Sequence, residues 1–222
     1  MTAPTGDSVP IYTVGYGARS VDELFALLRA HALRYLLDVR SAPYSKFKPE
    51  FSRDALATAA RTAGLEYRFL GDQLGGQPDD PRCYQDGKVI YEAVARTPAY
   101  REGIARLEQA RARGLRVALM CSEGKPELCH RSKLIGETLT AEGIPVLHID
   151  EVGAILTHAE VMERLTGGQL TLFGESDFTS RKRHRRGSDG DSEEGGDPGA
   201  RRGRDLRGDW ATDGGSEDED GA

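Results

Sequence analysis

"IYTVGYGARSVDELFALLRAHALRYLLDVR", residues 11–40, is the stretch that decides the fold. Its first four residues and residues 35–39 are almost all apolar, which is typical of short buried strands. Between them, Ser20 and Glu23 have the S-x-x-E spacing of a helix capping box, and leucines follow at helical spacing. The stretch therefore predicts a strand, a helix that ends near Ala32, and a second strand.

The same strand-then-helix order recurs along the rest of the chain. Apolar runs predict further strands at residues 66–70, 115–120 and 144–149, and helical spacing predicts helices at residues 52–64, 88–95, 99–112, 126–141 and 158–165. Residues 71–87, rich in Gly, Asp and Pro, predict a long irregular excursion. This order predicts an α/β fold, a mostly parallel sheet with helices on both faces in three layers. Such sheets bind ligands beyond the carboxyl ends of their strands.

Composition divides the chain into four segments. Residues 10–166 carry an ordinary apolar content and are predicted to form the α/β domain. From Arg181 onward there is one Trp, one Leu and no Ile, Val, Phe, Tyr, Met or Cys, so burial cannot offset the entropy lost on ordering. We therefore predict a flexible N-terminus at residues 1–9, a peptide motif and linker at 167–176 and a disordered charged tail at 177–222.

Bulk composition excludes several classes of protein. Three cysteines do not make a disulfide framework, and the N-terminal MTAPTGDSVP lacks the basic and apolar regions of a signal peptide. Because no apolar run approaches the ~20 residues of a membrane span, we predict a cytoplasmic protein without membrane contact. The formal net charge of −6 neither favours nor excludes nucleic acid, since a local basic face can bind phosphate on an acidic protein.

A second informative stretch is MCSEGKPELCHRSKL, residues 120–134, which follows a predicted strand. A thiol at that strand end, Cys121, meets backbone N–H groups of the next loop, a setting that activates thiols and binds anions. The carboxylates of Glu123 and Glu127 work against a thiolate. The sequence therefore leaves two interpretations open, a catalytic Cys121 and an ordinary buried cysteine.

A metal site is the third interpretation of this stretch. Cys121, Cys129 and His130, with the distant Cys83, offer four ligands. The spacing C-x7-C-H is not that of a zinc knuckle, and adjacent Cys and His side chains rarely both reach one zinc ion. We therefore predict neither a metal nor a cofactor, although the spacing leaves metal binding by this group undecided.

Basic side chains follow two of the predicted strands. Arg40 comes just past one strand, and Arg131 opens the helix that follows another. Because converging guanidinium groups and helix N-terminal amides bind phosphate or carboxylate, we predict an anion cleft. The alternative is that Asp38 and Arg40 merely pair with their neighbours. The predicted site residues are Arg40, Arg131, Lys46 and Lys48 for anion binding, and Cys121, Glu123, His130 and Asp38 for catalysis, with Glu123 and His130 as proton carriers.

Several of these segments together resemble the bacterial and archaeal family called domain of unknown function 488. The resemblance covers roughly residues 10–150. It is carried by residues Thr13–Tyr16, Asp38–Ser45 with Pro49, Leu70–Gly71, Leu74–Gly76, Cys121–Glu123 and Cys129–Ser132. It implies an α/β domain whose motif residues line one site, and it implies no particular reaction.

The segment Gln169-Leu170-Thr171-Leu172-Phe173 is similar to the Q-L-x-L-F peptide by which bacterial repair and replication proteins hold the DNA sliding clamp. Leu170, Leu172 and Phe173 would enter an apolar pocket, and Gln169 would fix the orientation by hydrogen bonds. The alternative is a last edge strand packed on the domain. The basic run Arg181–Arg186 predicts contact with nucleic acid, or else a solubilising linker.

These observations favour a DNA repair or replication accessory protein that is recruited to the sliding clamp. Its α/β domain would carry a cleft for a phosphate, a nucleotide or a nucleic-acid anion. Two alternatives stay open, a small-molecule enzyme with a cysteine nucleophile and a non-catalytic binding module. The sequence does not decide whether the protein is an enzyme.

Overall fold

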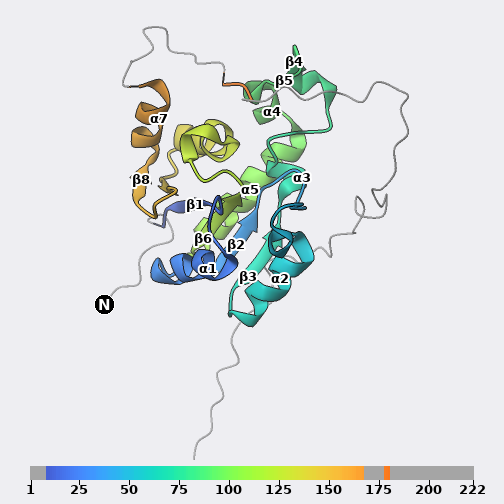
Figure 1. The fold of residues 1–222 in the computed structure, drawn as a ribbon. Helices are drawn as coiled ribbons and strands as arrows, with labels where there is room; N and C mark the ends of the chain where they lie inside the picture. The colour runs from blue at the N-terminus through green and yellow to red at the C-terminus, as the bar shows by residue number, and fades with distance from the viewer. Residues whose placement is uncertain (1–8, 168–177, 181–222) are drawn as a thin grey trace, which may run out of the picture. The chain divides into compact units, whose positions relative to one another are not determined.

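The computed structural model describes residues 9–167 and 178–180. These residues form a six-stranded sheet with the order β3-β2-β6-β1-β7-β8 (Figure 1). Its strands are β1 (Ile11–Gly15), β2 (Tyr35–Asp38), β3 (Glu66–Phe69), β6 (Val117–Cys121), β7 (Val146–Ile149) and β8 (Ile155–Thr157). All neighbouring strands are parallel except β7 and β8, which are antiparallel. The prediction of an α/β fold with a mostly parallel sheet is confirmed.

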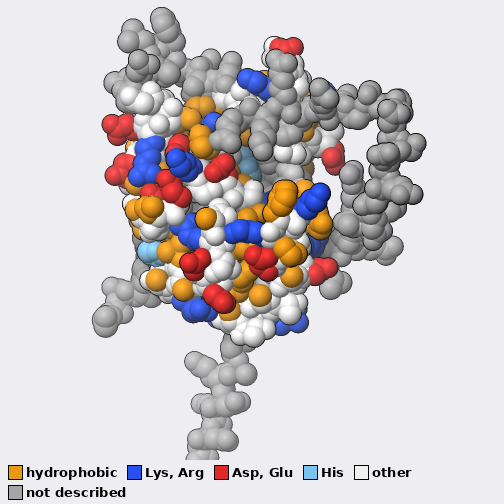
Figure 2. Space-filling model, viewed as in Figure 1, with side chains coloured by type: hydrophobic (Ala, Val, Ile, Leu, Met, Phe, Trp, Pro, Cys, Tyr) orange, Lys and Arg blue, Asp and Glu red, His pale blue; other side chains and the backbone are white. Residues whose placement is uncertain are grey.

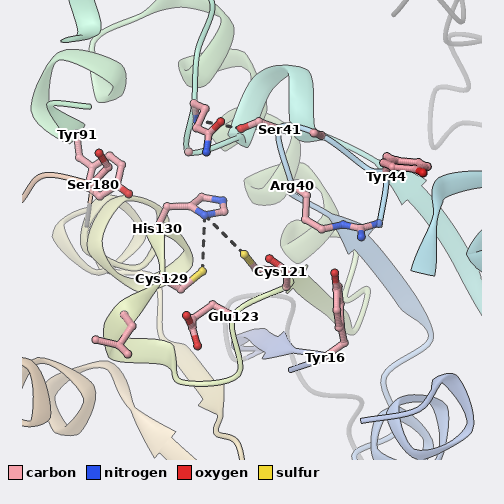
Figure 3. Close-up of a pocket in the computed structure, with 15 residues that line it drawn as sticks. Tyr16, Arg40, Ser41, Tyr44, Tyr91, Cys121, Glu123, Cys129, His130 and Ser180 are labelled. Carbon is pink, nitrogen blue, oxygen red and sulfur yellow. Dashed lines mark hydrogen bonds between the residues drawn. The ribbon is translucent and has the colours of Figure 1, made fainter. Parts of the chain in front are cut away.

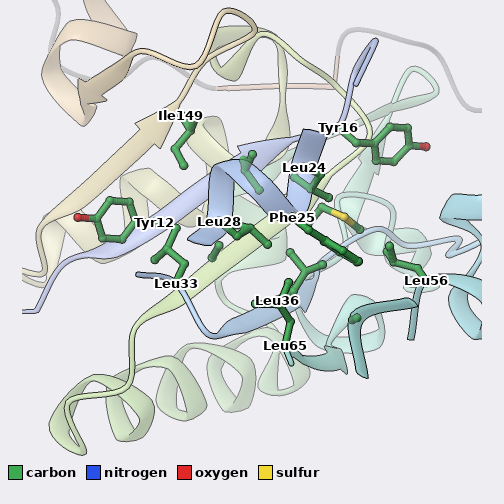
Figure 4. Close-up of a cluster of buried hydrophobic side chains, with 14 of the residues drawn as sticks. Tyr12, Tyr16, Leu24, Phe25, Leu28, Leu33, Leu36, Leu56, Leu65 and Ile149 are labelled. Carbon is green, nitrogen blue, oxygen red and sulfur yellow. The ribbon is translucent and has the colours of Figure 1, made fainter. Parts of the chain in front are cut away.

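Helices lie on both faces of this sheet (Figure 1). The α-helices are α1 (Val21–Ala30), α2 (Arg53–Thr62), α3 (Gly71–Leu74), α4 (Tyr91–Ala95), α5 (Pro98–Ala112), α6 (Glu137–Ala141) and α7 (His158–Thr166). Helices α1 and α2 pack on one face, and α5 runs along the other (Figures 1 and 4). The two helical layers bury the sheet between them, as parallel strands require.

A cluster of buried side chains joins α1 and α2 to the sheet (Figure 4). Alternate residues of the strands face it, among them Val14 and Met120, which are both fully buried. Helix α1 contributes Leu24, Phe25 and Leu28, at the spacing that places side chains on one side of a helix. The apolar residues of the strands and those of helix α1, both recognised by their spacing in the sequence, therefore pack in one core.

Helix α1 begins where its capping box predicts. The Ser20 hydroxyl accepts a hydrogen bond from the Glu23 N–H at 3.2 Å, and the Glu23 carboxylate accepts one from the Ser20 N–H at 2.7 Å. Both otherwise unpaired N–H groups are thereby satisfied. The helix ends at Ala30, two residues before the predicted end.

Two of the predicted helices are different in the structure. Residues 88–95 begin as strand β5 (Lys88–Val89), paired with β4 (Tyr84–Gln85), before α4 starts. Residues 126–141 are a 3-10 turn (Pro126–Leu128), a π-helical segment (Arg131–Gly136) and then α6. The Ser132 hydroxyl donates to the Pro126 and Cys129 carbonyl groups, which also accept backbone N–H groups, so a side chain competes for these acceptors at the start of the segment.

Several short helices and strands are not predicted from the sequence. Strand β8 has three residues, and the excursion at residues 71–87 contains α3, a 3-10 turn (Pro81–Cys83) and β4. Elements of two to four residues show too little periodicity to be read from a sequence. The excursion is consequently more ordered than its composition predicts.

Part of the predicted tail lies against the domain. The Phe178 carbonyl accepts from the Tyr91 N–H at 3.1 Å, and Thr179 forms a β-bridge with Ile90. The Ser180 N–H donates to the Val89 carbonyl at 3.0 Å, and the Ser180 hydroxyl accepts from the Val89 N–H at 3.0 Å. Residues 178–180, which the sequence assigns to the tail, therefore pair with the backbone of residues 89–91.

Other predictions for the chain ends lie outside the described residues. These are the N-terminal segment up to residue 8, the peptide Gln169–Phe173, the basic run Arg181–Arg186 and the rest of the charged tail. Within the described ranges no helix combines the length and the apolarity that a membrane span needs; the longest, α5, has 15 residues.

The core predicts how two neighbouring leucines will respond to truncation. Leu28 is 1% exposed in the cluster, whereas Leu27 is only partly buried at its margin. Leu28→Ala should lower the free energy of unfolding by about 2–5 kcal/mol, because it leaves a cavity. Leu27→Ala should cost about 1 kcal/mol. Urea denaturation of both variants tests this, and equal losses would contradict the assigned packing.

Candidate functional site

A cavity of about 300 Å³ lies beyond the carboxyl ends of β1, β2 and β6 (Figure 3). Strand register brings these ends together, since Gly15 pairs with Cys121 and Asp38 pairs with Met120. Residues that line the cavity come from these strand ends and from distant segments: Tyr16, Arg40, Ser41, Tyr44, Gly76, Gln77, Tyr91, Cys121, Glu123, Cys129, His130 and Ser180, with Ala42, Ser122 and Leu128. The cavity occupies the edge of the sheet where a parallel fold places ligands.

Arg40 is the arginine in the cavity wall, and it is 5% exposed. Its Nε donates to Asp38 Oδ1 at 2.9 Å and its Nη2 donates to Asp38 Oδ2 at 2.6 Å. Nη2 also donates to the Phe51 carbonyl at 2.8 Å. Burial alone would lower the pKa of this guanidinium, but the Asp38 carboxylate overrides burial and raises the pKa. Nη1 is buried with no hydrogen-bond partner among the described residues.

Asp38, predicted as a catalytic residue, lies under the wall. Its side chain is fully buried, and both oxygens accept hydrogen bonds from Arg40. The Tyr67 hydroxyl donates to Asp38 Oδ2 at 2.8 Å. The structure thus shows the paired Asp38 and Arg40 of the alternative interpretation, and Asp38 orients Arg40.

Two thiols and an imidazole converge on the cavity floor (Figure 3). Cys121 and Cys129 are 6% and 4% exposed. His130 Nδ1 lies 3.8 Å from Cys121 Sγ and 3.6 Å from Cys129 Sγ, while its Nε2 lies 3.0 Å from the Val39 carbonyl oxygen. Because a carbonyl can only accept, Nε2 carries the proton in the neutral ring, and Nδ1 presents a lone pair to both sulfur atoms.

The surroundings of the two thiols shift their pKa values in opposite directions. A hydrogen bond from Cys129, followed by the charges of His130 and Arg131, lowers the pKa of Cys121 well below its usual value despite burial. Burial and the neighbouring Cys121 raise the pKa of Cys129.

The same side chains are a candidate metal-ligand set. The donor atoms of Cys121, Cys129 and His130 all lie within 4.8 Å of one another. Adjacent Cys and His side chains rarely both reach one zinc ion, but in this chain His130 Nδ1 lies close to the sulfur atoms of both Cys121 and Cys129 (Figure 3). The distant Cys83 is buried in the Pro81–Cys83 turn and is not part of the set.

Arg131 lies below the cavity and not in its wall. It is fully buried, and it donates from Nη1 to the Glu123 carbonyl at 2.6 Å and from Nη2 to the Gly124 carbonyl at 2.8 Å. A Cβ atom at Gly15 would collide with this guanidinium and with the Glu123 carbonyl. Arg131 therefore holds the loop after β6, and it is not among the residues that line the cavity where anion binding was predicted.

The two lysines predicted to bind an anion lie outside the cavity lining. Lys46 is exposed, and neither it nor Lys48 lines the cavity. Lys48 donates from Nζ to the Arg19 carbonyl at 2.7 Å, and so it closes a loop. Glu123 does line the cavity, and its carboxylate accepts from the Lys125 N–H at 3.3 Å.

Sequence reasoning missed several residues of the wall. Ser180 reaches it through the β-bridge of the returning segment, and Tyr91 reaches it from the start of α4. Burial raises the pKa of the Tyr91 hydroxyl, which keeps its proton. Gly76 lies so close to His130 that a Cβ atom there would be 2.7 Å from the ring. The Gly75-Gly76 pair was the one available sign of this close approach.

A family model described as "Domain of unknown function DUF488" matches residues 20–137, slightly more than half of the chain. The protein belongs to the DUF488 family. The matched region of this DUF488 chain includes Arg40, Cys121, Cys129 and His130, and it ends before α7 and Ser180. The structure therefore places the family's region around most of the cavity.

Among curated proteins, the DUF488 chain is similar to a phosphoserine phosphatase of Thermus thermophilus. The two are 30% identical over 146 residues, which cover 60% of this chain and 57% of the relative. The chain thus spans little more than half the length of the curated relative it matches. No solved structure matches the chain.

Arg131 provides a test of how the loop is held. Arg131→Lys keeps the charge but cannot bridge the Glu123 and Gly124 carbonyl groups, so it should lower the free energy of unfolding by about 2–3 kcal/mol. Lys125→Ala, on the exposed part of the same loop, should change it by less than about 0.5 kcal/mol. Chemical denaturation of both variants provides the comparison. Similar losses would show that Arg131 does not hold the loop.

Proposed function

We propose that the cavity binds a small phosphate-bearing molecule and that the protein is an enzyme acting on phosphate esters. The observation that carries this proposal is the buried Nη1 of Arg40, which has no hydrogen-bond partner among the described residues although Arg40 forms part of the cavity wall. A buried N–H group without an acceptor is costly, and an anion in the cavity would supply one.

Binding of the phosphate would depend more on the fixed orientation of the Arg40 N–H groups than on the net charge of the cavity. Asp38 compensates the charge of Arg40, and the carboxylate-bearing Glu123 lines the same cavity. The guanidinium is held by Asp38 and by the Phe51 carbonyl, so it loses no further freedom when a ligand arrives. On the face shown in Figure 2, basic and acidic side chains are intermingled and do not form one broad basic surface.

The size of the site favours a small ligand. A volume of about 300 Å³ is at the lower end of the range for small-molecule sites. Tyr44 lines the mouth and is 73% exposed, and Phe47 on the same loop is 92% exposed. Such aromatic faces can stack on a nucleobase, which makes a nucleotide a candidate within the phosphate-bearing class.

The curated relative supports the same class of substrate. Its printed name is that of a phosphatase for a phosphorylated amino acid, and its similarity to this chain extends over 146 residues. Two chemistries could cleave an ester here: attack by Cys121 with His130 as base, or attack by a metal-activated water. Without either chemistry, the same cavity would serve a non-catalytic phosphate-binding module.

Phosphate binding tests the role of Arg40. Arg40→Lys keeps a positive charge beside Asp38 but removes the planar fork, so inorganic phosphate should bind about tenfold more weakly. Isothermal titration calorimetry or ³¹P NMR line broadening measures this. Lys46→Gln removes an exposed charge outside the cavity and should leave phosphate binding unchanged. Unchanged binding by Arg40→Lys, or an equal loss in both variants, would reject the assignment.

A second candidate function is recruitment to the DNA sliding clamp in repair or replication. It is supported by the peptide pattern of Gln169–Phe173, which lies in the sequence between Gly167, the C-cap of α7, and Phe178, which pairs with the domain. The basic run Arg181–Arg186 directly follows Ser180, a residue of the cavity wall. Nucleic acid near this run would bring phosphates close to the cavity.

Pull-down with a bacterial sliding clamp tests this candidate. The double variant Leu172→Ala/Phe173→Ala should lose the clamp, because it removes both apolar anchors. Thr171→Ala, at the variable position of the peptide, should retain it. If the double variant recovers as much clamp as the unaltered chain, the peptide does not mediate recruitment.

A further inference from the structure

We infer that Cys121, Cys129 and His130 form a binding site for a thiophilic divalent metal ion, for which Zn²⁺ is the suitable probe. The inference goes beyond the proposed function, because phosphate recognition at Arg40 requires no metal. It rests on the convergence of three donor atoms from two separate segments, the end of β6 and the turn before the π-helical segment.

The two sulfur–nitrogen separations match those of a tetrahedral zinc site. With Zn–S near 2.3 Å and Zn–N near 2.0–2.1 Å, tetrahedral angles place sulfur and nitrogen ligands about 3.6 Å apart and two sulfur ligands about 3.8 Å apart. The two Sγ–Nδ1 separations in this chain are 3.8 Å for Cys121 and 3.6 Å for Cys129. The two sulfur atoms lie no more than 4.8 Å apart. An ion can therefore be placed with little movement of the ligands.

The imidazole is already oriented for this role. The hydrogen bond between Nε2 and the Val39 carbonyl fixes the ring, and in the neutral imidazole it leaves Nδ1 as the atom that can bind an ion. Metal-ligating histidines ordinarily donate their other N–H group to such a carbonyl or carboxylate. Gly76 packs against the Cβ–Cγ–Nδ1 part of His130, where any larger residue would displace the ring.

The segment that carries Cys129 is also fixed from several sides. The Ser132 hydroxyl donates to the Cys129 carbonyl, and the Arg131 N–H donates to Cys129 Sγ at 3.5 Å. The guanidinium of Arg131 holds the loop that begins at Cys121. These contacts position both thiols in the metal-free chain, so an ion would meet a largely formed site.

The second thiol distinguishes this site from a simple cysteine nucleophile. A nucleophile needs one thiol beside a base, whereas here two buried thiols share the same Nδ1 atom. Two sulfur donors and one imidazole suit Zn²⁺ and other soft ions rather than Mg²⁺ or Ca²⁺. Glu123 lines the cavity but is not one of the converging donors, so the set supplies three protein ligands and leaves a fourth position.

An incomplete ligand set of this kind is characteristic of catalytic rather than structural zinc. The residues that line the cavity include Arg40 as well as the three donors. A phosphate held at Arg40 would therefore share the cavity with the open position of the ion. Metal binding by the three donors does not depend on phosphate binding.

The full-length chain, reduced and stripped of metal with a chelator, tests the inference. Titration with Zn²⁺ in competition with a chromophoric chelator, together with native mass spectrometry, should show one ion per chain. Cys121→Ser and Cys129→Ser should each weaken binding by at least about 100-fold, the upper end of the loss seen for outer-shell partners alone. Cys83→Ser is the matched control, because Cys83 is buried away from the set, and it should bind as the unaltered chain does.

Cobalt substitution tests the ligand set without any variant. Co²⁺ in the unaltered chain should show thiolate-to-metal charge-transfer bands and the intense visible absorption of a tetrahedral site. Absence of these bands, absence of stoichiometric zinc, or an equal loss of binding in Cys83→Ser would overturn the inference. Phosphate binding is measured separately through Arg40→Lys, so a chain that binds zinc but not phosphate contradicts the proposed function alone.

Discussion

The placement of β6 between β1 and β2 is the constraint on which the site depends. Parallel pairing puts Cys121 opposite Gly15 and Met120 opposite Asp38, so three strand ends share one edge. The loop after β6 must then pass directly over the end of β1. Only glycine fits at position 15, because a Cβ atom there would overlap the Glu123 carbonyl and Arg131. The register of the sheet therefore sets the path of the loop after β6, and that path sets the position of Cys121 in the cavity.

Two buried arginines serve that arrangement in different ways. Arg131 donates to two backbone carbonyl groups and holds the loop, whereas Arg40 is matched by the carboxylate of Asp38. Removing a guanidinium from water is costly unless its N–H groups find acceptors, yet each of the two keeps one buried nitrogen without a hydrogen-bond partner among the described residues, Nη1 of Arg40 and Nε of Arg131. The difference that matters for function is location. Arg40 forms part of the cavity wall, and Arg131 supports the loop that carries Cys121.

The DUF488 region does not supply the whole site. It contains the ends of β2 and β6, the two cysteines and His130, but the end of β1 with Tyr16 precedes it, and Ser180 comes from beyond it through a short segment that pairs with β5. That segment follows the predicted clamp-binding peptide in the sequence and directly precedes the basic run. The wall of the cavity is thus covalently joined to the part of the chain in which partner contacts are predicted.

The sequence by itself determined the α/β fold, the α1 capping box and the segments that supply most of the site. Apolar periodicity and polar residues at strand ends are local patterns, so they can be read from the sequence without knowledge of the strand order. Only the tertiary structure decided that Arg131 is buried, that Cys129 and His130 turn together toward Cys121, and that Ser180 returns to the wall. These facts depend on strand order and side-chain direction, which long-range packing sets and neighbouring residues in the chain do not encode.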